Sequence, residues 1–255
     1  MLPFSKILKE RKVEKMFNYK GISAKKMGLR VLNDITFDAP KRSTILIDVP
    51  GRNGNLVMDN GRYEDVVRSI PCRLEAPKKR DVEKLISKIH NWLGQEVGYH
   101  EFLWHKDPDH IYLAMVENGA MSSRRLSQLA QTLIDFSIYP IKYIKSSMIE
   151  REVDNGTIIV NDAEMKANPI IRIVGVGLIR LTIGENNITI NIPTETEGCI
   201  INSENRTITS LDKQIPLFRN TTGTFPVLDL GNNTLIWESA NEVQVFVTPR
   251  LGVLI

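Results

Sequence analysis

Apolar and polar residues alternate over several short stretches of the chain, and this period of two predicts half-buried β-strands. The clearest pair is 179–183 and 188–192, where every second residue is isoleucine or leucine and the Gly-Glu-Asn-Asn turn 184–187 lies between. Further strands are predicted at 17–21 (with its turn), 44–49, 70–74, 134–138, 198–202, 206–210, 234–238 and 243–248. The pattern therefore predicts a mainly β protein.

Proline shapes two of these predicted strands. The strand at 44–49 ends in Pro50-Gly51-Arg52-Asn53-Gly54-Asn55, because proline stops a ladder and the two glycines permit the positive φ of tight turns. The strand at 70–74 contains Pro71, which cannot donate to a ladder. We therefore expect that strand at the edge of its sheet.

A helical period of 3.6 residues is convincing at one place, residues 82–93. The apolar residues there form a single stripe, which predicts a helix that covers one face of a sheet. Asp81 is a suitable N-cap and Gly94 a suitable residue to end the helix.

Residues 99–105 and 111–116 predict a hairpin that is apolar on nearly every residue, joined by the turn residues Lys106-Asp107-Pro108-Asp109. Phe102, Trp104 and Tyr112 are its large aromatic residues. A two-stranded hairpin with so much apolar surface is unstable alone. It is expected to pack against its own domain or against a neighbouring subunit.

The composition changes near residue 150, after which Asn, Thr, Gly and Ile dominate and no amphipathic helix recurs. We therefore predict a charged N-terminal extension at 1–15, a first domain at 16–149 and an all-β domain at 150–255. Many short strands with frequent turns favour an antiparallel sandwich for the second domain.

Charge and composition exclude several classes of protein. Residues 1–16 carry five basic and two acidic side chains, which accounts for the whole net charge of +3, so the folded part lacks the basic excess of a nucleic-acid binder. No apolar run is long enough to span a bilayer, and the N-terminus lacks a signal-peptide core, so we expect synthesis in a cytoplasm. Cys72 and Cys199 are expected to be reduced core residues.

Candidate chemistry is sparse. His100, His105 and His110 could hold a metal only if they converged, and residues five apart on a strand point to opposite faces, so polar turn residues are the favoured interpretation. Glu195 and Glu197 lie in a Thr-rich loop with nothing to mark them as an acid and base pair. No nucleophile elbow or phosphate-binding loop occurs. We predict no enzyme activity, no cofactor and no metal.

Trp237 is a candidate sugar contact, because an aromatic face can stack on a sugar ring. Burial as a core residue is the competing interpretation. A carbohydrate-binding module that recognises host cell-wall polysaccharide is therefore kept as the alternative function, and a cell-wall hydrolase as a distant third.

Several segments together resemble the distal tail proteins of long-tailed bacteriophages and prophages of Gram-positive hosts. They begin with Phe17–Ser23 and Met27–Leu29 and are most similar at Ile47–Leu56, which contains the Pro-Gly-Arg-x-Gly turn. The resemblance continues at 161–177, 200–204 and 223–233 and ends at Pro249-Arg250. Residues 1–15 lie outside the family pattern.

This resemblance implies a ring-forming N-terminal β-sandwich or split barrel with one helix and a hairpin, followed by a galectin-like C-terminal sandwich. It implies a homohexameric ring at the virion tail tip, assembled in the host cytoplasm, that joins the tail tube protein to the baseplate hub, with a receptor-binding protein as a further candidate partner. Genome DNA would pass through the ring without sequence-specific contact. The residues expected at the contact between subunits are Pro50, Gly51, Arg52, Gly54, Phe102, Trp104 and Tyr112.

Overall fold

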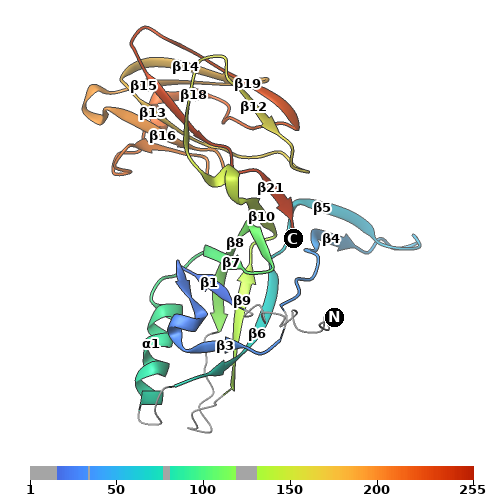
Figure 1. Cartoon of the computed structure of the whole chain (residues 1–255). Helices are drawn as coiled ribbons and strands as arrows, with labels where there is room; N and C mark the ends of the chain where they lie inside the picture. Colours follow the sequence, from blue (N-terminus) through green and yellow to red (C-terminus); the bar gives the residue numbers. More distant parts are fainter. Residues whose placement is uncertain (1–15, 34, 77–80, 119–130) are drawn as a thin grey trace, which may run out of the picture. The chain divides into compact units, whose positions relative to one another are not determined.

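The computed structural model describes residues 16–33, 35–76, 81–118 and 131–255, and the predicted extension 1–15 lies outside them. The chain divides into two compact units (Figure 1): unit 1 runs to Pro140 without residues 109–111, and unit 2 contains 109–111 and 141–255. We expected a boundary at 149/150. The boundary between the units falls at Pro140/Ile141, because Ile141–Ile144 pairs with the C-terminal strand Gly252–Leu254.

Unit 1 is built on a curved antiparallel sheet with the strand order β2-β1-β7-β8-β9-β6-β3. Its strands are β1 (Phe17–Tyr19), β2 (Ile22–Ser23), β3 (Leu29–Val31), β6 (Val66–Leu74), β7 (His100–Trp104), β8 (Asp107–Asn118) and β9 (Gln131–Ile138). A short 3-10 helix, Ala24–Met27, joins β2 to β3. Both edge strands are only two or three residues long, which limits the open edge of this sheet.

The core of unit 1 is aromatic. Phe17 stacks on Phe102 at 5.2 Å between ring centroids, and both contact the edge of Phe136. Helix α1 (Val82–Gly94) covers this face of the sheet: Trp92 stacks on Phe17 and donates a hydrogen bond from Nε1 to the Tyr19 carbonyl at 3.2 Å. The predicted amphipathic helix is therefore confirmed.

The predicted ends of α1 need correction. Asp81 makes no side-chain capping hydrogen bond, and its backbone is already right-handed helical, where a capping residue is normally extended. Gly94 is the last residue of the helix, and Gln95 continues the right-handed conformation with its N–H donated to Asn91. The helix thus ends without the left-handed glycine that we expected.

Strand β6 lies inside the sheet, between β9 and β3, so the predicted edge position is wrong. Pro71 is tolerated because β3 pairs only with residues 72–74 and ends at Val31. Beyond that end, Leu32 donates its N–H to the Pro71 carbonyl at 2.9 Å. The reciprocal bond, from Pro71 to the Leu32 carbonyl, cannot form, so the missing N–H falls where β3 ends and not in the middle of its ladder.

The predicted hairpin at 99–116 is confirmed as β7 and β8, but its turn is shorter than expected. Trp104 pairs with Asp107, so only His105 and Lys106 form the turn and Asp107–Asp109 belong to β8. Tyr112 donates a hydrogen bond to the Asp107 carboxylate at 2.6 Å, which holds that residue on the strand.

Unit 2 contains two five-stranded sheets, ordered β11-β20-β13-β16-β17 and β12-β19-β14-β15-β18. The first consists of β11 (Arg151–Val153), β13 (Ile170–Val174), β16 (Gly198–Asn202), β17 (Thr207–Ser210) and β20 (Gln244–Thr248). The second consists of β12 (Ile158–Asn161), β14 (Gly177–Ile183), β15 (Asn186–Ile192), β18 (Thr221–Gly223) and β19 (Gly231–Ser239). Strands β10 (Ile141–Ile144) and β21 (Gly252–Leu254) pair with each other, and β10 also pairs with residues 110–111 of β8, which belong to unit 2.

One apolar core, rich in isoleucine, joins the two sheets of unit 2. The alternating residues of β14 and β15 point into it: Ile179 pairs with Ile190 and Leu181 with Ile188, and all four are about 1% exposed. The predicted strand–turn–strand and the mainly β fold are therefore confirmed. Three short 3-10 helices, Lys145–Met148, Thr194–Thr196 and Phe218–Asn220, occur in the connections.

Candidate functional site

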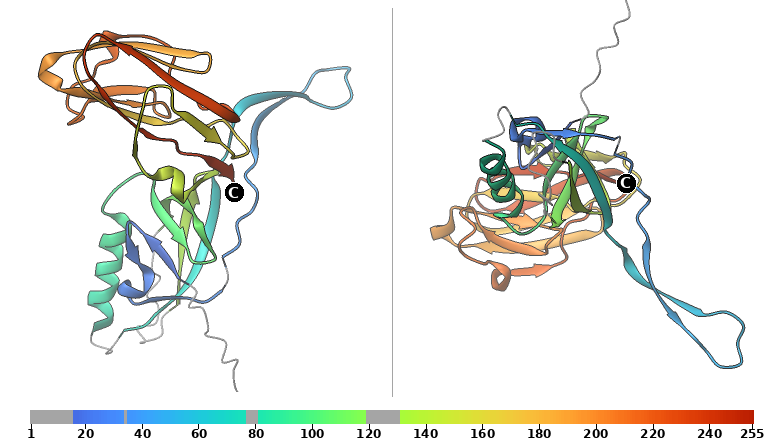
Figure 2. Two further views of the ribbon diagram at one scale, coloured as in Figure 1. Left: turned by 45° about the horizontal axis from the view of Figure 1, so that its top comes forward. Right: turned by 90° about the horizontal axis from the view of Figure 1, so that it is seen from below.

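The most conspicuous surface feature is a hairpin of β4 (Arg42–Ile47) and β5 (Leu56–Tyr63), called the arm below. The two strands form their own two-stranded sheet, and within the described residues no third strand pairs with either of them. Figure 2 shows the arm standing away from the main sheet of unit 1. Both outer backbone edges of the arm are thus open to another strand.

The tip of the arm is the turn that the sequence singled out. Arg52 donates its N–H to the Val49 carbonyl at 3.1 Å, with Pro50 second and Gly51 third in the turn. Gly51 has φ 82°, which fits a type II turn with proline and glycine at their favoured positions. Gly54 follows at φ 77°, and all four predicted contact residues of the tip are exposed. They are therefore accessible to a partner.

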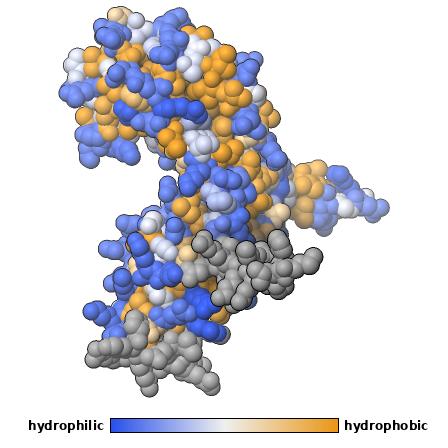
Figure 3. Space-filling view, viewed as in Figure 1, coloured by the Kyte–Doolittle hydropathy of each residue, from blue (hydrophilic) through white to orange (hydrophobic). Residues whose placement is uncertain are grey.

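Both faces of the arm are apolar. Ile45 pairs with Met58 and Ile47 with Leu56 on one face, while Leu46 pairs with Val57 on the other. Their exposed fractions are 49%, 50%, 37%, 41%, 60% and 60%, respectively. In Figure 3 these strands appear as hydrophobic surface that ends in a hydrophilic tip.

A free two-stranded ribbon with apolar side chains on both faces is unfavourable in water. Elsewhere in unit 1 the strands bury one face against the aromatic core. Each of the six arm side chains would gain on the order of 1 kcal/mol if a partner covered it. The arm is therefore a candidate contact surface.

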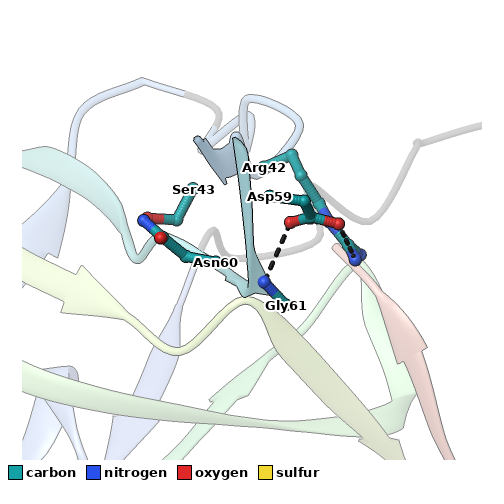
Figure 4. A network of polar contacts seen from close by, with 5 residues as sticks. All are labelled: Arg42, Ser43, Asp59, Asn60 and Gly61. Carbon is teal, nitrogen blue, oxygen red and sulfur yellow. Dashed lines mark hydrogen bonds and ion pairs between the residues drawn. The ribbon is translucent and has the colours of Figure 1, made fainter. Parts of the chain in front are cut away.

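The root of the arm is held by a polar clamp (Figure 4). Arg42 donates to both carboxylate oxygens of Asp59, from Nε at 2.9 Å and from Nη2 at 2.6 Å. The Asp59 carboxylate also accepts the Gly61 N–H at 2.9 Å, and Asn60 donates to the Ser43 hydroxyl at 3.1 Å. The clamp spans the irregular register between β4 and β5, where a bulge sets the direction of a ribbon.

The clamp shifts the pKa values of both its charged side chains. The hydrogen bond from Arg42 lowers the pKa of the Asp59 carboxyl, and the Gly61 N–H adds to this effect. The same hydrogen bond raises the pKa of the Arg42 guanidinium. Arg42 also lies over the Tyr63 ring, 4.9 Å from its centroid. Bidentate geometry and ring stacking both hold the guanidinium in one orientation.

The other predicted contact residues lie inside their own unit. Phe102, Trp104 and Tyr112 are 0%, 4% and 3% exposed and belong to the aromatic core of unit 1. The apolar hairpin therefore packs against its own domain, which was one of the two expected arrangements. These three side chains shape the sheet and are not available for a direct contact with another subunit.

The candidate sugar contact Trp237 lies on the inward side of β19. Its side chain packs against the core of unit 2, and Asn155 clasps its backbone, donating to its carbonyl at 2.8 Å and accepting its N–H at 2.9 Å. The Trp237 side chain is half-buried, so most of its contacts are with the core, and the sugar contact stays a prediction.

The described residues hold no group of three or more His, Cys, Asp or Glu side chains that could bind a metal. His100 lies 3.8 Å from Glu96, whereas the ring of His105 contacts the backbone of Met16. Cys72 and Cys199 are free and buried, as expected, and burial raises the pKa of each thiol to about 12. Among the described helices none is long and apolar enough to cross a membrane.

The apolar faces and the clamp were missed at the level of the sequence. Ile45-Leu46-Ile47 and Leu56-Val57-Met58 are continuous apolar runs, and such runs normally indicate a strand buried on both faces. The pattern alone did not reveal that these side chains are exposed in the described residues. No motif marks the Arg42–Asp59 pair, because its partners are 17 residues apart.

The chain thus has a mainly β, two-unit fold with one α-helix in its described residues and an apolar arm. This fold is similar to the crystal structure of the SPP1 Dit (gp 19.1) protein, with a TM-score of 0.61 and 12% sequence identity over 94% of this chain and 99% of that one. That protein is described as a paradigm of the hub adsorption apparatus in Gram-positive infecting phages. No protein-family profile and no curated protein matches the chain.

Proposed function

We propose that this protein is a structural component of a phage tail tip, in which six copies form a ring that joins the tail tube to the baseplate hub. The apolar arm is the observation that carries the proposal, because it calls for a partner outside the monomer. The likeness in fold to a phage hub adsorption protein supports the choice of setting. The proposal assigns the protein no catalytic role.

A second copy of the chain is the proposed occupant of the arm. In a ring, each subunit donates one arm and receives another, so every apolar arm is covered without a specialised end subunit. A single contact by one arm is weak, because a gain of about 1 kcal/mol per side chain is offset by the cost of association. Closure of the ring adds a second contact to every subunit.

The remaining partners follow from the proposed position. One face of the ring would bind the tail tube protein and the other the baseplate hub, with a receptor-binding protein as a further candidate. Assembly would take place in the host cytoplasm before the ring enters the virion. Genome DNA would pass through the ring without sequence-specific recognition.

Light scattering coupled to gel filtration, with negative-stain imaging, tests the proposal. The expected result is closed rings with about six times the 29.0 kDa mass of one chain. Antibody labelling of virions should then mark the tail tip. A monomer at all concentrations that also fails to form rings with tube and hub proteins would contradict the proposal.

A further inference from the structure

The tip of the arm carries an Asn-Gly pair, Asn53-Gly54, and the chain contains three more, at 60–61, 118–119 and 155–156. Asn-Gly is the dipeptide most prone to lose ammonia spontaneously, because glycine places no side chain near its own nitrogen. The two reacting groups are the asparagine side-chain amide and the backbone nitrogen of the following glycine. Whether they react in a folded protein depends on how firmly both are held. The three pairs within the described residues differ in this respect.

At 155–156 both reacting groups are engaged. The Asn155 amide is bound at both ends to the Trp237 backbone, at 2.8 and 2.9 Å. The Gly156 N–H donates to the Leu235 carbonyl at 2.8 Å. Two sets of hydrogen bonds would have to break before the Gly156 nitrogen could reach the Asn155 side chain.

At 60–61 the clamp has the same effect. The Asn60 amide donates to the hydroxyl of Ser43, which is buried, and the Gly61 N–H donates to the Asp59 carboxylate at 2.9 Å. This pair is in the same arm as Asn53-Gly54, so a shared position on the arm does not decide the reactivity. The local hydrogen bonds of each Asn-Gly pair decide its reactivity.

At 53–54 neither group is held. Both residues are exposed, and within the described part of the chain neither the Asn53 amide nor the Gly54 N–H has a hydrogen-bond partner. A side chain added at Gly54 would meet no atom within 4 Å, so the space around the pair is open. Ring closure at this pair therefore needs no hydrogen bond to break.

We infer that Asn53 is a site of spontaneous deamidation in the folded protein. The deprotonated Gly54 nitrogen attacks the Asn53 Cγ, a C–N bond forms, and the side-chain amide leaves as ammonia. Water then opens the resulting succinimide at either carbonyl and gives aspartate or isoaspartate. The only co-reactant is water, and the product carries a new carboxylate beside Arg52.

Peptide mapping by mass spectrometry tests the inference. The folded chain is incubated at mildly alkaline pH, digested with trypsin, and the gain of 1 Da is localised by fragmentation, because Asn53 and Asn60 share one tryptic peptide. We expect Asn53 to convert more than about tenfold faster than Asn60 or Asn155, the factor that one hydrogen bond corresponds to. In the chain unfolded in urea, all three should convert at similar rates.

Two outcomes would overturn the inference: no conversion at Asn53 in the folded chain while the unfolded chain converts there, or equal rates at Asn53 and Asn155 in the folded chain. Asn53→Gln is the control variant, since a longer side chain disfavours the five-membered ring, and it should lose the early mass gain. This result does not depend on ring formation, so it decides the inference even if the proposed function fails.

A consequence for assembly rests on the proposed function. If the tip contacts a second copy, aged protein should form rings less well than fresh protein, and Asn53→Gln should not show this decline. Light scattering of fresh and aged samples of both proteins measures the effect. Loss of ring formation to the same extent in the variant would show that ageing acts elsewhere.

Discussion

At the scale of single residues, the two thiols show how burial controls reactivity. Cys72 and Cys199 are both 0% exposed, and burial raises the pKa of each to about 12. We therefore predict that neither thiol reacts with a water-soluble disulfide reagent at neutral pH in the folded protein, whereas both react in denaturant. Absorbance of the released thiolate measures the count, and a fast reaction in the folded state would contradict the prediction.

A second prediction at this scale concerns Asp59. The pKa of Asp59 is lowered in the folded protein, chiefly by the Arg42 hydrogen bond. The clamp therefore makes its full contribution to folding stability at pH values above 3.8, the ordinary pKa of this carboxyl. The contribution is lost only as the pH falls through the lowered pKa. We expect the Gly61 amide signal to titrate with a midpoint below 3.8, since its N–H donates to Asp59.

NMR of glycine-labelled protein measures this titration. Asp59→Asn is the matched variant, because it keeps the shape of the side chain and removes the carboxylate. In that variant the Gly61 signal should no longer titrate. A wild-type midpoint at or above 3.8 would show that the clamp is absent in solution.

At the scale of elements, glycine packing in unit 2 gives a test of the sandwich. Gly223 on β18 has φ 106°, and a Cβ there would lie 2.3 Å from the Asn187 carbonyl oxygen. Gly184, in the turn between β14 and β15, has φ 57° and meets no atom within 4 Å. The same substitution therefore has different costs at these two positions.

We predict that Gly223→Ala destabilises the protein by roughly 3 kcal/mol or more, through backbone strain and a clash. Gly184→Ala should cost only about 1 kcal/mol, the strain of a left-handed residue. Urea unfolding followed by circular dichroism gives both values. Equal losses in the two variants would contradict the described pairing of β15 and β18.

The elements also show how far the sequence could predict this fold. Alternation revealed β14 and β15, and a helical stripe revealed α1, because each buries one face within its own unit. The prediction from Pro71 that β6 is an edge strand was wrong, because the effect of this proline depends on where β3 ends. That end is a tertiary fact that no local pattern contains.

The candidate site was predictable in part for the same reason. The turn at the tip of the arm was predictable, because Pro50, Gly51 and Gly54 set the backbone conformation locally. The large aromatic residues of the 99–116 hairpin, and not the arm strands, were predicted to contact another subunit. The size of a side chain does not show whether it is covered within its own domain. Exposure of Leu46 and Val57 becomes visible only when the neighbours in space are known.

At the scale of the whole molecule, the proposed function requires that the apolar arm joins copies of the chain. The paired substitutions Leu46→Ser and Val57→Ser change one face of the arm, at two positions that are each 60% exposed. They should leave the stability of the monomer within about 0.5 kcal/mol, as is usual for surface positions. Leu178→Ser is the control, because this residue of unit 2 is 62% exposed and lies outside the arm.

Sedimentation velocity of the wild type, the arm variant and the control tests this claim most directly. We predict that the wild type and Leu178→Ser sediment as one ring species, whereas Leu46→Ser with Val57→Ser sediments as a folded 29.0 kDa monomer. A ring of unchanged stability in the arm variant would contradict the proposed role of the arm, and so would a wild type that remains monomeric.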